Sequence, residues 1–181
     1  MKARIITITG HRDLAPADFD VVEQKMYDLI ASNQESSSPK VHTIYFGGAR
    51  GADTVALNAA LEFREKLFGK PSLLHRVSPK LIVVVPNTLK DQPASTHSIT
   101  KRADEIVELK NPITFLDNYA AFHKRNHYMV DRSTEIQAFW DFKSRSGTWK
   151  TIEYAQDVKK MPVFKTKVVG QDVNRGREFR V

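Results

Sequence analysis

HTIYFGGARGADTVALNAALEF, residues 42 to 63, joins an apolar run to an amphipathic segment through a turn that holds three glycines and an arginine. The run from His42 to Phe46 is short and apolar, which is typical of a buried strand. Apolar residues then recur every four positions from Ala52 to Phe68, which predicts a helix with one buried face. They are Val55, Ala59, Phe63 and Leu67. The order of strand, glycine turn and helix is the repeating unit of an α/β sheet.

Other parts of the chain repeat this unit. Apolar runs predict further strands at Arg4 to Thr9, Leu81 to Val85, Ile136 to Trp140 and, over a shorter run, Pro162 to Phe164. Apolar spacing predicts a helix at Ala17 to Ala31, and a third helix is expected at about Trp149 to Lys159. Because strands that alternate with helices form right-handed βαβ units, the sequence predicts an α/β fold: a Rossmann-like open, mainly parallel sheet with helices on both faces. Such sheets bind ligands beyond the carboxyl ends of their strands.

The expected domain organisation is one nucleotide-binding domain over residues 1–165, followed by a basic C-terminal tail over 166–181. Residues 86–126 show no obvious strand and contain two helical pieces, Ile99 to Leu109 and Phe115 to Lys124. A long excursion after a central strand is often an active-site lid, although structural filler explains it equally well.

Composition restricts the function classes. The chain has no cysteine, which excludes disulfides, thiolate metal sites and cysteine nucleophiles. No apolar stretch approaches the roughly 18 to 20 residues that span a bilayer, so we expect a cytoplasmic protein with no membrane partner. The net charge of +7, from 28 Lys and Arg against 21 Asp and Glu, favours anionic partners such as nucleotides or nucleic acid.

Polar clusters follow three of the predicted strands. The first strand ends in TGHR, where Thr9 and Gly10 permit a tight turn and the side chains of His11 and Arg12 project over the edge of the sheet. A plain strand-to-helix turn with a solvent-exposed arginine explains the same residues.

The second cluster is the glycine turn. Gly47, Gly48 and Gly51 let the backbone approach a ligand closely, and N–H groups at the start of the next helix carry a partial positive charge. Arg50 can add hydrogen bonds to a phosphate. Asp53 can cap the helix or accept a hydrogen bond from a ribose hydroxyl, and Thr54 follows it. The turn matches neither a GxGxxG nor a Walker loop.

The third cluster follows the strand EIQAFW, where Ser146, Gly147 and Thr148 open a helix with small residues and hydroxyl groups. Upstream of that strand, Arg125 and Asn126 can frame a phosphate and a base. Met129, one helical turn beyond Arg125, is interpreted as a core residue.

Because all three clusters lie at the carboxyl ends of parallel strands, we expect them to converge on one crevice that holds a phosphate-bearing ligand. The expected ligand-binding residues are Thr9, Gly10, His11, Arg12, Gly47, Gly48, Arg50, Gly51, Asp53, Thr54, Arg125, Asn126, Ser146, Gly147, Thr148 and Thr151.

The order of GGARGAD, RNxxMVD and SGTxxT resembles the SLOG superfamily, a Rossmann-like group that includes the DNA-processing protein A fold and the Lonely Guy cytokinin-activating hydrolases. Within it, the chain is similar to small bacterial and phage members that carry TGHR-like and GGARGAD-like motifs. The resemblance covers residues 3 to about 164, except the 86-to-120 segment, and implies a nucleotide-derived ligand. The family tendency also suggests a homodimer.

In Lonely Guy hydrolases an arginine and a glutamate cleave the N-glycosidic bond of a nucleoside monophosphate, and the resemblance places the arginine at Arg125. At the position of the glutamate this chain has Thr151, and Glu153 lies two residues further, on the opposite face of a helix. A carboxylate normally stabilises the oxocarbenium-like state of such a reaction. Arg125, Asp53 and Glu153 are therefore the candidate catalytic residues if the chain is an enzyme.

Three functions remain open from the sequence. The first is a sensor, carrier or sequestering protein for a nucleotide or an ADP-ribose-like molecule. The second is a nucleoside-monophosphate N-glycosidase (phosphoribohydrolase). The third is single-stranded nucleic-acid binding, for which Tyr119, Phe122, His123, His127 and Tyr128 are the nearest approach to an aromatic stripe. We expect no cofactor and no metal site, because His123 and His127 have no evident third ligand.

Overall fold

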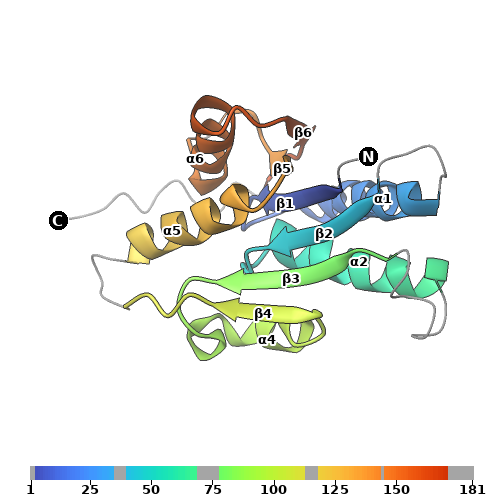
Figure 1. Cartoon of the computed structure of the whole chain (residues 1–181), viewed down its shortest axis with the longest axis horizontal. Coiled ribbons are helices and arrows are strands. Elements are labelled where there is room, and N and C mark those ends of the chain that lie inside the picture. Colours follow the sequence, from blue (N-terminus) through green and yellow to red (C-terminus); the bar gives the residue numbers. More distant parts are fainter. Residues whose placement is uncertain (1–2, 35–39, 69–77, 113–117, 144, 171–181) are drawn as a thin grey trace.

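The computed structural model describes residues 3–34, 40–68, 78–112, 118–143 and 145–170 (Figure 1). Its strands are β1 (Arg4–Gly10), β2 (Val41–Phe46), β3 (Lys80–Val85), β4 (Glu105–Glu108), β5 (Glu135–Trp140) and β6 (Val163–Lys167). Its α-helices are α1 (Pro16–Ala31), α2 (Ala52–Phe68), α4 (Ala94–Thr100), α5 (Asn118–Asp131) and α6 (Gly147–Glu153), the last continued by a π-helical turn over Tyr154–Val158. Short 3-10 helices cover Ser32–Gln34 and Leu89–Asp91.

The strands form one six-stranded sheet in the order β4-β3-β2-β1-β5-β6, and all of its neighbouring strands pair in parallel. This confirms the Rossmann-like α/β fold. The chain first proceeds from β1 to β4 toward one edge, and α5 then returns it to β5, beside β1. The strand order therefore reverses between β1 and β5, which is where ligands of open α/β sheets bind.

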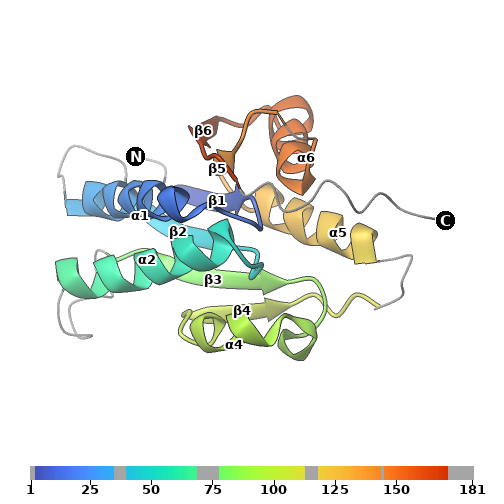
Figure 2. The same cartoon turned by 180° about the vertical axis from the view of Figure 1, so that it is seen from behind.

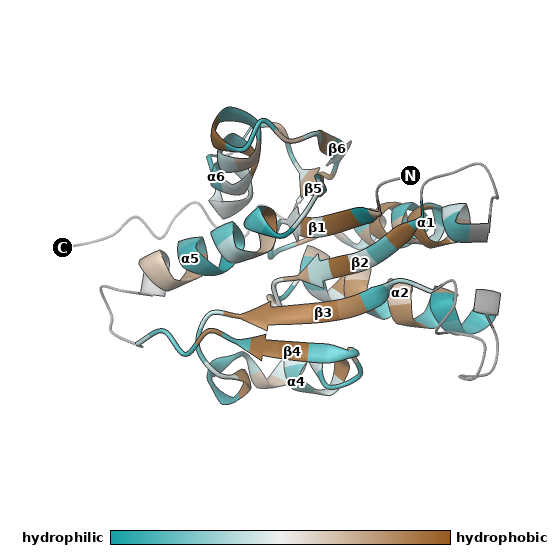
Figure 3. Ribbon diagram, viewed as in Figure 1, coloured by the Kyte–Doolittle hydropathy of each residue, from teal (hydrophilic) through white to brown (hydrophobic). Residues whose placement is uncertain are grey.

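Helices cover both faces of the sheet, because side chains alternate along each strand. Ile6, Ile8 and Phe46 belong to the largest buried cluster, together with apolar residues of α1 and α2. On the other face, Val84 is buried with Met129 of α5, and Ala138 with Ile152 of α6. Figures 1 and 2, drawn from opposite sides, show α1 and α2 on one face and α5 on the other. Figure 3 shows strands β1 to β3 as the hydrophobic centre of the sheet.

The five strands predicted from apolar runs are present, with bounds that shift by a few residues. The expectation of no strand in residues 86–126 is wrong, because Glu105–Glu108 forms the edge strand β4, paired with β3. A helix over Ile99 to Leu109 is wrong for the same reason, since α4 already ends at Thr100. The apolar pattern that would predict β4 is weak, because the strand has only four residues, with an exposed glutamate at each end.

The remaining expectations about domain organisation stay predictions. The predicted helix Phe115 to Lys124 begins in residues outside the described part of the chain, and α5 runs on to Asp131. In the expected tail, Thr166 and Lys167 end β6 and Val168 is buried, whereas residues 171–181 lie outside the described ranges. Within the described residues, none of the helices combines the length and the apolar character needed to cross a bilayer.

Candidate ligand-binding crevice

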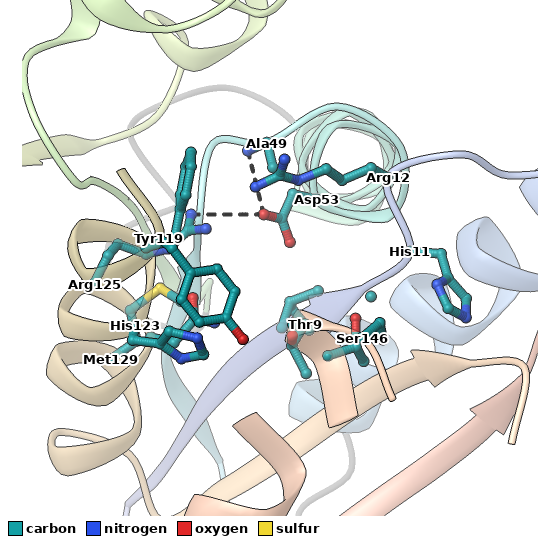
Figure 4. Close-up of a pocket in the computed structure, with 16 residues that line it drawn as sticks. Thr9, His11, Arg12, Ala49, Asp53, Tyr119, His123, Arg125, Met129 and Ser146 are labelled. Atoms are coloured by element: carbon teal, nitrogen blue, oxygen red, sulfur yellow. Dashed lines mark hydrogen bonds and ion pairs between the residues drawn. The ribbon is translucent and has the colours of Figure 1, made fainter. Parts of the chain in front are cut away.

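A cavity of about 620 Å³ lies at the carboxyl ends of β1 and β5, at the point where the strand order reverses. Five segments line it: the end of β1 with the loop after it, the turn after β2, the start of α2, helix α5 and the start of α6. Its volume is within the range of roughly 300–1,000 Å³ of pockets for small molecules and cofactors. Figure 4 shows labelled side chains from all five segments around this space.

His11 connects three segments at the floor of the crevice. Its backbone N–H donates to Phe139 O and its carbonyl accepts from Ala52 N at 2.9 Å. Its imidazole Nε2 accepts a hydrogen bond from Asp141 N at 3.0 Å, and Figure 4 shows the ring turned away from Asp53 and Tyr119. His11 therefore holds the ends of β1 and β5 and the start of α2 together, which positions its neighbour Arg12.

Arg12 brings a positive charge to the cavity wall, close enough to Asp53 for the two charges to interact. Its guanidinium carbon lies 4.6 Å from the centre of the Phe122 ring, a cation–π arrangement that restricts the side chain. In the part of the chain that the structure describes, no carboxylate forms an ion pair with it. An anionic ligand can therefore bind Arg12 without displacing a protein carboxylate.

Asp53 and Arg125 form a buried ion pair at the inner wall. Asp53 Oδ2 lies 3.9 Å from Arg125 Nη1, and the two side chains are 9% and 6% exposed. Asp53 Oδ2 also accepts from Ala49 N at 3.2 Å, and Arg125 Nη1 donates to Gly47 O. Burial raises the pKa of Asp53 and lowers the pKa of Arg125, while each partner's charge opposes the shift of the other.

The glycines of the turn make room for protein atoms. A Cβ at Gly47 would overlap the Arg125 guanidinium and lie 2.7 Å from Asp53 Oδ2. Gly48 has φ +68°, and a Cβ there would lie 3.0 Å from Val83 Cγ1. Gly51 has φ +77°, and a Cβ there would overlap backbone carbonyl oxygens of the loop after β1. The turn is thus packed between β3, α5 and that loop.

The opposite wall is built by the start of α6. Ser146 is the N-cap of the helix, and Thr148 is buried at the cavity. Thr151 donates to Gly147 O at 2.9 Å and accepts from Asn126 Nδ2 at 2.8 Å. Thr151 therefore fixes the orientation of the Asn126 amide.

The structure brings ten of the expected site residues to the cavity. They are Thr9, Gly10, His11, Arg12, Asp53, Arg125, Asn126, Ser146, Gly147 and Thr148. The others lie behind or beside the wall: Gly47, Gly48, Arg50, Gly51, Thr54, Thr151 and Glu153. Arg50 and Glu153 are exposed, and Thr54 donates to Ala49 O at 2.8 Å. Whether any of these residues binds a ligand stays a prediction.

Aromatic residues at the mouth of the cavity were not among the expected ligand-binding residues. Tyr119, Phe122 and His123 of α5 line it, and Figure 4 shows the Tyr119 hydroxyl directed toward Thr9 and Ser146. Tyr119 packs edge-to-face on His123, and His127 stacks on Tyr154 at 3.7 Å between ring centres. In the sequence, these aromatic residues and Asn126 follow one another at spacings of three and four positions, and such residues share one face of a helix. This spacing could have predicted that the aromatic residues line the same site as Asn126.

Comparisons with known proteins identify similar folds. DNA processing protein A from Helicobacter pylori, solved to describe its single-stranded DNA binding mode, matches with a TM-score of 0.62 and 22% identity, over 94% of this chain and 67% of that one. TM1055, a structural genomics target, matches with a TM-score of 0.52 and 10% identity, over 88% of this chain and 72% of that one. No protein-family model and no curated protein matches the sequence. The chain therefore shares its Rossmann-like fold with DNA processing protein A, and at this identity the likeness concerns the fold alone.

Proposed function

We propose that the chain binds a nucleotide or a nucleotide-derived, phosphate-bearing ligand in the crevice between β1 and β5, as a sensor, carrier or sequestering protein. The observation that carries this proposal is Arg12, an arginine without a carboxylate partner among the described residues, held against Phe122 on the wall of a nucleotide-sized cavity. Charge-assisted hydrogen bonds from arginine suit phosphate oxygens, and aromatic rings at the same mouth suit a base.

Binding without cleavage is favoured by the wall formed by α6. A hydrolase of the Lonely Guy type needs a carboxylate where this chain has Thr151, and Thr151 is buried in two hydrogen bonds. Glu153 is exposed and does not line the cavity. Neither position supplies a carboxylate to an oxocarbenium-like transition state.

One observation supports hydrolysis as a second candidate. Asp53 is the only carboxylate among the described residues that line the cavity, and burial raises its pKa. Incubation with nucleoside monophosphates, followed by chromatography, tests this candidate. We expect no free base; base release that disappears in Asp53→Asn would establish the hydrolase instead.

The binding proposal is tested by thermal unfolding with nucleoside mono-, di- and triphosphates, ADP-ribose, dinucleotides and cyclic nucleotides. A ligand at a hundred times its Kd stabilises the folded state by about 2.7 kcal/mol, which raises Tm by about 5 to 10 °C in a chain of this size. We expect one class of ligand to give this shift and Arg12→Ala to reduce it strongly. Lys124→Ala, which removes an exposed positive charge of α5 outside the cavity, is the matched control.

Two outcomes would contradict the proposal. Unchanged Tm values across the whole panel would exclude a small nucleotide ligand. Binding of single-stranded oligonucleotides alone, with an affinity that falls steeply as salt increases, would assign the crevice to nucleic acid. An equal loss of the shift in Arg12→Ala and Lys124→Ala would show that net charge, and not the cavity, determines binding.

A further inference from the structure

The carboxylate of Asp53 has one oxygen engaged by the protein and one directed into the cavity. Oδ2 accepts from Ala49 N and faces Arg125, and the carboxylate also receives a backbone hydrogen bond from Gly47. Figure 4 shows the second oxygen turned away from these partners, toward the space bordered by Thr9 and Ser146. Asp53 therefore presents a single hydrogen-bond acceptor to whatever occupies this part of the crevice.

Asn126 presents a second acceptor in the same cavity. The Thr151 hydroxyl donates to Gly147 O and must therefore accept from the Asn126 amide, which assigns Nδ2 to that bond. The other polar atom of this amide, Asn126 Oδ1, makes no hydrogen bond with the described part of the chain. Asn126 is buried and lines the cavity, so a ligand that fills the space meets this carbonyl oxygen.

The two acceptors restrict which part of a ligand can lie against them. A phosphate group would bring no donor to either oxygen. Bidentate pairing of a carboxylate with a base edge needs both oxygens, and Oδ2 is already engaged. Single donors meet the requirement, and among those of a nucleotide the sugar hydroxyls lie nearest to the phosphate that Arg12 is proposed to bind.

We propose that Asp53 and Asn126 accept hydrogen bonds from the sugar hydroxyls of the ligand, an inference that rests on the nucleotide binding proposed above. The crevice then selects ribonucleotides over 2′-deoxyribonucleotides. Arg12 lies close enough to Asp53 to interact with its charge. Phosphate and sugar are adjacent in a nucleotide, so one ligand can contact the arginine and the acceptors together. A ligand without the hydroxyl leaves a buried acceptor unpaired, which weakens binding.

The experiment compares matched ligands on the unmodified protein. Titration calorimetry with the four ribonucleoside 5′-monophosphates, their 2′-deoxy counterparts and 3′-deoxyadenosine 5′-monophosphate gives the affinity ratio for each pair. One hydrogen bond to a charged group increases the affinity for the ribonucleotide over its deoxy counterpart by about 10- to 100-fold. We expect this preference for at least one of the two hydroxyl positions.

Asp53→Asn, which keeps the shape of the side chain and removes its charge, is expected to reduce the preference to a few-fold. Equal affinities for ribo- and deoxyribonucleotides on the unmodified protein would overturn the inference while leaving nucleotide binding intact. Absence of binding by every monophosphate would contradict both proposals. A preference that persists unchanged in Asp53→Asn would assign sugar recognition to other residues. If the variant does not fold, the comparison on the unmodified protein still decides.

Discussion

Replacing Gly51 by alanine is expected to destabilise the protein by roughly 2 to 6 kcal/mol, the sum of backbone strain and steric overlap. Gly51 has φ +77°, a conformation that residues with a Cβ adopt only with strain. The added Cβ would overlap the carbonyl oxygens of His11 and Arg12, which are backbone atoms and cannot rotate away. The loop after β1 would have to move, and with it the arginine proposed to bind the ligand.

Gly147→Ala is the matched control for this prediction. Gly147 lies at the start of α6, and a Cβ there would meet nothing within 4 Å. We expect its unfolding free energy to remain within about 0.5 kcal/mol of the unmodified protein, as for most surface substitutions. Chemical denaturation of both variants measures the difference. A Gly51→Ala variant as stable as Gly147→Ala would contradict the described packing of the turn.

The Arg125→Met variant is expected to lose about 3 to 5 kcal/mol of stability at neutral pH. Methionine fills a similar space but leaves the Asp53 carboxylate buried without its cation and the Gly47 carbonyl without its donor. In a chain of this size, the loss corresponds to a fall in Tm of about 6 to 20 °C. Lys124→Met, at the adjacent exposed position of α5, should change Tm little.

The loss of stability in Arg125→Met should become smaller as the pH falls. Burial raises the pKa of Asp53 above its ordinary value of 3.8, and the charge of Arg125 opposes that rise. Without Arg125 the pKa of Asp53 in the folded state rises further. A carboxyl group with a raised folded-state pKa costs stability at high pH, and this cost shrinks as the pH falls through the folded-state pKa and vanishes near the unfolded-state pKa. The difference in Tm between the variant and the unmodified protein should therefore shrink from pH 7 toward pH 4, and a constant difference would contradict a buried carboxylate.

The sequence was sufficient to predict the parallel α/β fold and five of the six strands that the structure describes. Apolar runs such as Leu81 to Val85 are long enough to be recognised, and polar residues after β1 and β5 indicated the edge of the sheet where the cavity lies. The strand β4 was missed because Ile106 and Val107 are only half-buried, so an edge strand of this length carries little apolar signal.

The roles of individual residues depended on contacts between distant parts of the chain. Gly47 and Arg125 are 78 positions apart, and local spacing cannot reveal that the glycine makes room for the guanidinium. Placing Arg50 at the ligand followed from its position in the turn, whereas in the structure Arg12 lines the cavity and Arg50 does not. Tertiary packing, and not the motif, decides which arginine faces the crevice.

The ion pair between Asp53 and Arg125 also has a consequence for folding kinetics. Asp53 belongs to α2 on one face of the sheet, and Arg125 to α5 on the other, so the pair can form only after both layers have packed. Contacts completed late in folding mainly determine how fast a protein unfolds and contribute little to how fast it folds. A ligand that bridges the same two helices would therefore act chiefly by prolonging the lifetime of the folded state.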